Sequence, residues 1–293
     1  QDYLIFTGLL SPYETGKKVP ETMRQAALQR LRQLSAHEIG HTLGLQHNYA
    51  SSVNNRASVM DYPHPAVVLN NKGELDFSNV YTNEIGEWDK RAIQYGYTHF
   101  AEGIDEKNAL NALLEENQRK GLLFIADADA RAAGGFHPDA HLWDNNTDPV
   151  TELENVLAVR KKALEKFSEN AIRPNEPMSL LEDVLVPVYN YHRYQSEAVS
   201  KLIGGINYSY NVRGDKQVQP TVIPAATQLK ALQAVLKSLS PEVLTIPNKI
   251  VQIIPPRPPM YYGVGETFPK RTGMSFDPLA AAEALTHFQL SFL

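Results

Sequence analysis

Cysteine is absent from the 293-residue chain. This absence excludes disulfide bonds, thiol catalysis and cysteine-ligated zinc sites, so any bound metal must be held by histidine and carboxylate side chains. No apolar run approaches the roughly 18 residues of a membrane-spanning helix, and the positive residues form no long basic run. With a net charge of −5, the sequence therefore predicts neither a membrane span nor a nucleic-acid partner.

The rest of the composition is that of an ordinary globular protein, with 43% hydrophobic and 21% charged residues. A chain of 293 residues can form one large domain or two moderate ones. It begins at Gln1 without a basic-then-apolar leader, and we interpret it as a fragment or a processed product.

Four of the nine histidines lie within the stretch SAHEIGHTLGLQHNYASSVNNRASVMDYPHP, residues 35–65. The segment before them has no proline after Pro20 and no glycine before Gly40, and its apolar residues recur at roughly helical spacing. These observations predict a long helix that starts at Pro20 and ends near Gly44. Its apolar positions are Met23, Ala26, Leu28, Leu31, Leu34 and Ile39.

On that helix His37 and His41 are four residues apart, so they project from one face about 5–6 Å apart and can share one cation. Glu38 points about 100° away around the axis, where a carboxylate can accept a proton from a metal-bound water without acting as a ligand. Gly44 can adopt a positive φ, end the helix and turn the chain back, which brings His47 in as a third ligand. Three protein ligands leave the fourth position of a zinc ion open, as in catalytic sites.

The stretch HEIGHTLGLQH resembles the HExxHxxGxxH motif of the metzincin zinc peptidases. These enzymes carry a methionine-containing turn beneath the zinc, and SVMDYP supplies one with Met60. The resemblance implies that Met60 forms an apolar floor under the histidines without touching the metal. In astacin-like and serralysin-like metzincins the tyrosine of a Met-x-Tyr turn lies beside the zinc, where it can ligate the ion in the resting state and swing away to hold an oxyanion. The resemblance implies the same role for Tyr62.

The segment IGEWDKRAIQYGY, residues 85–97, resembles the metzincin helix that packs under the site, with Trp88, Ala92, Ile93 and Tyr95 expected in the core. Together the three segments are similar to a family of large, exported bacterial zinc-dependent metzincin proteases. The resemblance implies a periplasmic, cell-surface or extracellular location. His64 lies between two prolines and fits no ligand position, so we interpret it as a loop histidine.

The chain departs from metzincins ahead of the zinc helix, where they carry a mixed sheet whose edge strand binds extended substrate. Only 36 residues precede His37, and DYLIFTGLL is the one good strand candidate among them. We therefore expect a mainly α protein in which the mixed sheet of the intact α+β family is absent or reduced. The expected division is a zinc-binding catalytic portion, residues 1–100, and a mainly helical C-terminal domain, residues 101–293.

In the second half, periodicity predicts helices in residues 104–121, 148–167, 177–205, 225–238 and 278–288, with Asp148 as an N-cap and Pro187 as a kink. A short buried strand or helix end followed by a loop is expected in residues 121–135, and a hairpin in residues 206–223. HPDAH, residues 137–141, is expected to be a surface loop. DNNTD, residues 144–148, lacks the glycine and glutamate of a calcium loop and is expected to be a loop next to a helix cap. We interpret PPRPP, residues 255–259, as a packed linker.

The function that follows is a zinc-dependent endopeptidase acting on a protein or peptide substrate, with one catalytic Zn²⁺ on His37, His41 and His47. Glu38 would be the general base, and Tyr62 would stabilise the oxyanion. Two alternatives stay open on the sequence. One is a protease-derived, zinc-containing binding module without turnover, and the other is a zinc hydrolase of a non-peptide amide.

Overall fold

The computed structural model describes residues 2–13, 20–130, 135–215, 217, 219–261, 263, 265–271 and 273–293. Over these residues the protein is mainly helical, and its strands form two antiparallel pairs, which confirms the predicted fold class. The α-helices are α1 Asp2–Leu10, α2 Glu21–Thr42, α3 Glu87–Tyr97, α4 Glu106–Arg119, α5 Asp127–Ala130, α6 Pro149–Lys166, α7 Leu181–Tyr189, α8 Arg193–Ser200, α9 Ala225–Ser238, α10 Pro241–Leu244, α11 Asn248–Val251 and α12 Pro278–Leu290. Short 3-10 helices cover Ser52–Asn54, Glu169–Ala171 and Met178–Leu180.

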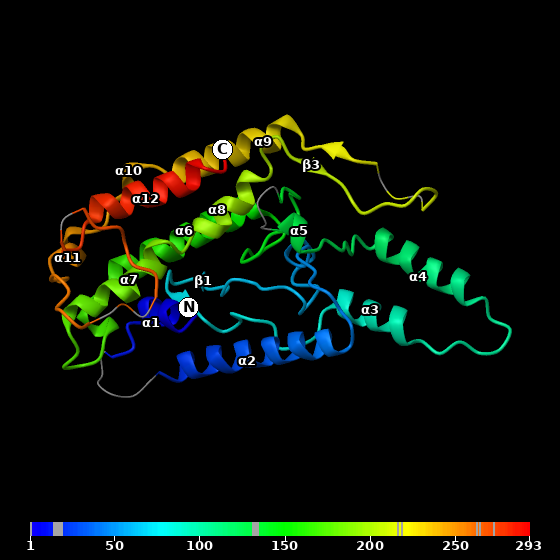
Figure 1. Ribbon diagram of the computed structural model, residues 1–293, viewed down its shortest axis with the longest axis horizontal. Coiled ribbons are helices and arrows are strands. Elements are labelled where there is room, and N and C mark those ends of the chain that lie inside the picture. Colours follow the sequence, from blue (N-terminus) through cyan, green and yellow to red (C-terminus); the bar gives the residue numbers. More distant parts are fainter. Residues whose placement is uncertain are drawn as a thin grey trace.

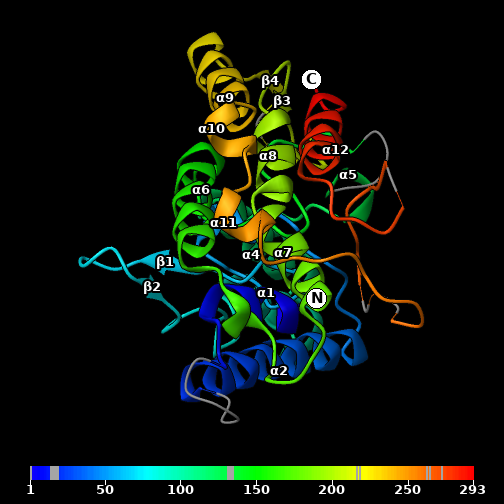
Figure 2. The same cartoon turned by 90° about the vertical axis from the view of Figure 1, so that its left-hand side faces the viewer.

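The helices are stacked in layers, with α2 along one side and α6, α7, α8, α9 and α12 above it (Figures 1 and 2). Extended segments that follow α2 run between these layers, and the pair β1 Val68–Leu69 and β2 Leu75–Asp76 extends outward from one edge of the stack (Figure 2). The main core lies between the layers and joins side chains of α1, α2, α6, α7 and α12 to those of residues 67–81. At one end of the stack, on the right of Figure 1, α3, α4 and the hairpin after α8 project outward. In the described part of the chain, no helix is long and apolar enough to cross a bilayer.

Helix α2 confirms the helix predicted from the apolar spacing around the histidines. It ends at Thr42, and Gly44 adopts the positive φ of 83° that turns the chain back. Met23 and Ala26 are buried in the main core, whereas Leu31 and Ile39 are each 58% exposed. Polar Gln29 and Gln33 take buried positions instead, because their amides bond the backbone of residues 59–81.

The strand expected in DYLIFTGLL is wrong, because these residues form α1. The side chains of Ile5, Phe6 and Leu9 are all buried, and Thr7 donates to the Tyr3 carbonyl one turn back at 2.7 Å. Gly8 faces α7, where an added Cβ would lie 2.2 Å from Val188 Cγ2. A short apolar run buried on most sides has no alternation that distinguishes a strand from a helix.

The single kinked helix expected in residues 177–205 is also wrong. The chain forms α7 and α8 with a break at residues 190–192, after Pro187. The buried Arg160 side chain donates to the Tyr189 carbonyl at 2.7 Å. A continuous helix would use that carbonyl for the backbone N–H of Arg193, so the guanidinium replaces a helical hydrogen bond.

The other predicted helices of the second half are confirmed as α4, α6, α9 and α12, whereas the short helices α10 and α11 were not predicted. Asp148 caps α6 by accepting from the Val150 N–H at 3.1 Å. Ile125 is buried in extended chain, α5 follows it, and residues 131–134 of the expected loop lie outside the described residues. Strands β3 Ile206–Asn207 and β4 Thr221–Val222 pair as the expected hairpin, whose Lys216 and Val218 lie outside the described residues.

Two smaller expectations need correction. HPDAH is not a surface loop, because both of its histidines are buried and His137 Nε2 donates to the Tyr208 carbonyl at 2.7 Å. None of the four residues of the segment 85–97 that were expected in the core is fully buried: Tyr95 is 44% exposed, and Trp88, Ala92 and Ile93 are half-buried. Helix α3 packs on α4 rather than on the main stack, so only part of its surface can be covered.

The proline-rich segment after α11 packs against α7, as expected for a linker. Arg257, between its prolines, is buried and its guanidinium bonds the Asp183 carboxylate at 2.6 Å. The same guanidinium lies 3.7 Å from Glu182, which also bonds Lys270 at 2.7 Å. Both buried carboxylates of α7 therefore have a cation at contact distance, which a buried charge requires.

Candidate metal centre

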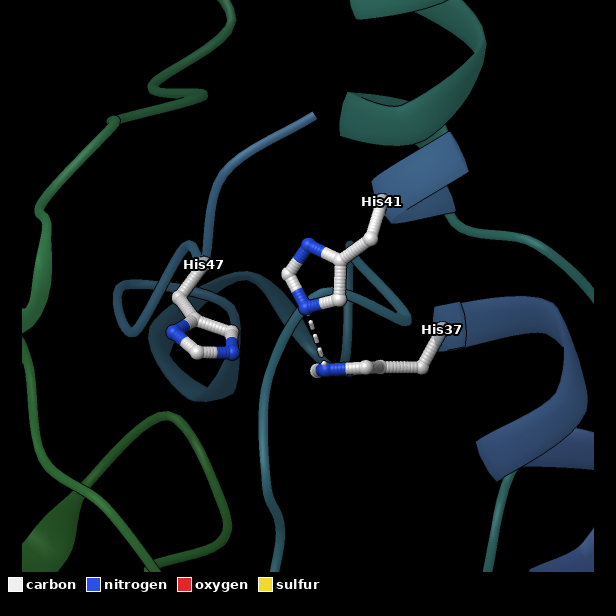
Figure 3. Close-up of side chains that lie close together, drawn as sticks. All are labelled: His37, His41 and His47. Carbon is white, nitrogen blue, oxygen red and sulfur yellow. Dashed lines mark hydrogen bonds between the residues drawn. The ribbon is translucent and has the colours of Figure 1, made fainter. Parts of the chain in front are cut away.

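Three histidines converge where α2 ends and the chain turns back (Figure 3). His37 and His41 project from one face of α2, and His47 approaches from the loop after Gly44. One nitrogen of each ring lies within 4.8 Å of the others. The ring centroids are 4.7 Å apart for the helical pair, and 5.2 and 4.9 Å from these two to His47. Among the residues that the structure describes, this is the single group of three or more such side chains close enough to hold one ion.

The inner nitrogens of the two helical histidines are both fixed by backbone carbonyls. His37 Nδ1 donates to the Val59 carbonyl at 2.8 Å, and His41 Nδ1 donates to the Leu45 carbonyl at 2.9 Å. A carbonyl oxygen can only accept, so each Nδ1 must carry the proton. In the neutral ring, Nε2 is then left with its lone pair.

Those two lone pairs face one another, because His37 Nε2 and His41 Nε2 are 3.1 Å apart (Figure 3). Two acceptors at this distance repel unless a cation lies between them. Two ligand nitrogens on a tetrahedral zinc ion, each at about 2.05 Å, would be about 3.3 Å apart. The spacing therefore fits a shared metal ion.

A proton is a poorer candidate for that cation. Burial lowers the pKa of His37, and neighbouring His41 and His47 lower it further, against the Val59 carbonyl bond and the Glu38 charge that raise it. The neutral imidazole that a metal needs is thus the favoured form of this ring.

The third histidine is oriented by a carboxylate instead of a carbonyl. His47 Nδ1 lies 2.8 Å from Asp127 Oδ1, which also accepts from the Tyr49 hydroxyl at 3.3 Å. His47 Nε2 is buried and has no hydrogen-bond partner. A buried polar atom without a partner is costly unless it binds something, so this nitrogen also fits a metal ligand.

Met60 lies against the helix that carries the first two histidines. Its side chain is fully buried, and a Cβ added at Gly40 would lie 2.3 Å from Met60 Sδ. The loop carrying His47 is joined to the same turn, since the Asn48 N–H donates to the Met60 carbonyl at 2.9 Å. A glycine at position 40 is therefore what lets the methionine approach the histidines from beneath.

Asp89 of α3 fixes the turn that orients His37. Its carboxylate accepts from Ser58 Oγ at 2.6 Å, from the Val59 N–H at 2.8 Å and from the Gly86 N–H at 2.7 Å. Val59 is the residue whose carbonyl receives the His37 ring proton. The buried carboxylate thus positions a ligand through one peptide unit, and burial raises its pKa against these three hydrogen bonds.

Tyr62 and Glu38 flank the histidines. The Tyr62 ring centroid lies 4.4 Å from that of His37 and 5.2 Å from that of His47. Burial and the charge of nearby Glu38 raise the pKa of the Tyr62 phenol, which is therefore a hydrogen-bond donor at neutral pH. Glu38 itself is exposed on α2, where solvent and a substrate can reach it.

His64 does not join the group. Its ring packs on Tyr191 with centroids 4.7 Å apart, and burial lowers its pKa to about 4. It is a neutral loop histidine, as the flanking prolines suggested.

A family model described as Met-zincin matches residues 20–293. The chain belongs to the Met-zincin family. No curated protein and no solved structure matches it significantly. Membership covers the zinc-helix segment and the whole helical half, so both are parts of one Met-zincin chain.

Two acidic residues that support the histidines of this Met-zincin centre, Asp89 and Asp127, were not predicted from the sequence. Asp89 is in the first turn of α3, where an acidic residue is expected only as a helix cap. Asp127 lies 80 residues beyond its histidine, in a segment with no motif. Only the folded chain brings either carboxylate to the site.

A pair of buried carboxylates lies beside the methionine. Asp61 accepts from the Tyr62 N–H at 2.6 Å, and Asp144 accepts from Ser52 Oγ at 2.9 Å. Burial raises the pKa of Asp61 well above its ordinary value, and the charge of Asp144 raises it further. Burial also raises the pKa of Asp144 to about 7. The two groups therefore disfavour ionisation of one another.

This pair predicts that stability falls as the pH rises. With a raised pKa, folded Asp144 keeps a proton that the unfolded chain releases, so its contribution is full below about pH 4 and lost as the pH approaches 7. Asp144→Asn mimics the protonated acid and should remove the part of the pH dependence that comes from Asp144. That part amounts to about 1.4 kcal/mol in the free energy of unfolding for each unit by which folding raises the pKa. Urea unfolding of both proteins with chelator, from pH 5 to 8, measures it. A stability difference between them that does not change with pH would contradict the assignment.

Proposed function

We propose that the protein is a zinc-dependent metallopeptidase, an endopeptidase in which His37, His41 and His47 hold one catalytic zinc ion. The observation that carries this proposal is the 3.1 Å approach of His37 Nε2 and His41 Nε2, with both Nδ1 atoms fixed as donors. Family membership supports a metallopeptidase in general terms. The donor set, three imidazoles and no thiolate, suits zinc with one open position.

When bound, the zinc ion supplies Lewis acidity, which polarises the scissile carbonyl and makes a water molecule easier to deprotonate. The exposed Glu38 carboxylate accepts the proton of that attacking water and returns it to the leaving amine. The Tyr62 phenol donates a hydrogen bond to the oxygen on which negative charge develops. Met60 forms the apolar floor of the metzincin methionine turn.

A second candidate, a zinc-containing binding module without turnover, is favoured by one observation. In metzincins the edge strand of a sheet binds extended substrate, but here Asp2–Leu10 form α1 and no sheet precedes α2 in the described part of the chain. A third candidate, hydrolysis of a non-peptide amide, would use the same groups. Stoichiometric zinc without cleavage of any member of a peptide library would favour one of these two over a peptidase.

An exported location belongs to the same proposal and rests on the resemblance to exported bacterial metzincins. Immunodetection in fractionated native cells tests it, and protein confined to the cytoplasm would contradict it.

Glu38→Gln should abolish most turnover and leave zinc bound. The amide keeps the shape of the side chain but cannot accept a proton, so cleavage of casein should fall by about 10²–10⁴-fold. Zinc content by mass spectrometry should stay at the wild-type level, since Glu38 is not a ligand. Glu106→Gln on α4 is an exposed control and should cleave normally. Normal cleavage by Glu38→Gln would show that another group is the base.

Tyr62→Phe should lower kcat more than it changes KM. It removes one donor to the developing oxyanion while the ring keeps its packing on His37, and loss of such a donor costs about 10²–10³-fold in kcat. Steady-state kinetics on a fluorogenic peptide checks this. An unchanged kcat would leave the phenol with a packing role alone.

A further inference from the structure

His47 is the one proposed ligand that no helix holds in place. His37 and His41 are spaced by α2, and their ring protons go to the carbonyls of Val59 and Leu45, which lie 22 and 4 residues further along the chain. His47 follows the Gly44 bend, and its ring nitrogen meets a carboxylate 80 residues away, on α5. The orientation of its ring therefore depends on how firmly the second half of the chain holds α5.

The segment leading into α5 is bonded to the loop that carries His47. The Tyr49 N–H donates to the Ile125 carbonyl at 2.9 Å, and the Ile125 N–H donates back to Asn48 Oδ1 at 3.2 Å. Asn48 Nδ2 donates to the Leu123 carbonyl at 2.9 Å. Tyr49, Ala50, Ile125, Ala130 and Ala140 form a small buried cluster behind these bonds. This network aligns Asp127 with His47.

From its other side, α5 is held by the residues next to strand β3. Asp129 accepts hydrogen bonds from the hydroxyls of Tyr208 and Tyr210, the latter at 2.6 Å. The Tyr210 oxygen also accepts from the Ala126 N–H at 3.2 Å. Lys201, just after α8, donates to the Asp129 carbonyl at 3.3 Å. The residues on both sides of Asp127 are thus fixed by the C-terminal half.

We propose that Asp127 is the positioning residue of the third zinc ligand, and that Tyr208 and Tyr210 hold Asp127 in place through Asp129. This inference rests on the proposed zinc site. Because a carboxylate can only accept hydrogen bonds, Asp127 keeps the ring proton of His47 on Nδ1 and directs Nε2 at the metal. It also makes Nε2 more basic and therefore a stronger metal ligand. The zinc affinity of the N-terminal motif is then set by a hairpin that lies more than 150 residues further along the chain.

Zinc affinity, measured by competition with a chromophoric chelator, tests the role of Asp127. Asp127→Ala should bind zinc about 10–100-fold more weakly than wild type. Asp127→Asn keeps an acceptor oxygen without the charge and should recover part of that loss. The melting temperature of the metal-free protein should stay unchanged, because the Asp127 side chain is 64% exposed. Glu106→Ala, which removes an exposed acid from α4, is the charge-matched control and should bind as wild type does.

The double variant Tyr208→Phe/Tyr210→Phe tests the hairpin. It removes both hydroxyl bonds to Asp129 and keeps the rings, so zinc affinity should fall by roughly 3–10-fold. Added to Asp127→Ala, the same pair should cause no further loss, because the tyrosines act through that carboxylate.

The possible outcomes distinguish failure of the proposed zinc site from failure of the proposed role of Asp127 or of the two tyrosines. A wild-type protein that binds no zinc would overturn the proposed function. A wild type that binds zinc, with an Asp127→Ala variant of equal affinity, would overturn only the role of Asp127. An equal loss from the tyrosine pair with and without Asp127 would overturn the connection through the hairpin.

Discussion

The site depends on one contact, the 3.1 Å approach of the outer ring nitrogens of His37 and His41. Each inner nitrogen donates to a backbone carbonyl, so the rings cannot turn or change tautomer to relieve the repulsion between their lone pairs. Burial of His37 also makes a proton a poor counter-charge. A metal ion relieves the repulsion, and by binding the folded state alone it would stabilise the whole chain. The metal-free fold therefore already holds the geometry that the ion needs.

The rest of the structure keeps those nitrogens in place. Gly40 has no side chain, which lets Met60 fill the space beneath α2. Asp89 fixes the peptide of Val59, and through it the ring of His37. These supports come from α3 and from the turn between α2 and α3, whereas the support of His47 comes from α5. The centre is thus assembled from both halves of the chain, in agreement with the main core, which both halves also share.

The sequence predicted those features that arise from local spacing. Helix α2, its end before Gly44 and the convergence of the three histidines follow from residues within one short stretch, and the bounds of α9 matched as well. The features that were predicted wrongly or not at all depend on contacts with residues far away in the sequence. The helix α1 requires α7 to pack against, and the break after α7 requires the Arg160 side chain from α6. Asp127 carries no local signal, because its role is defined by a ring 80 residues earlier.

The most direct test is zinc K-edge X-ray absorption on the zinc-loaded protein. The account predicts three imidazole nitrogens at about 2.0–2.1 Å, one further oxygen donor and no sulfur. In a His47→Ala variant the imidazole count should fall to two. A spectrum that shows a fourth imidazole or a sulfur ligand, or fewer than three imidazoles in the wild type, would contradict the claim that these three histidines hold an ion whose fourth position is left to an oxygen donor.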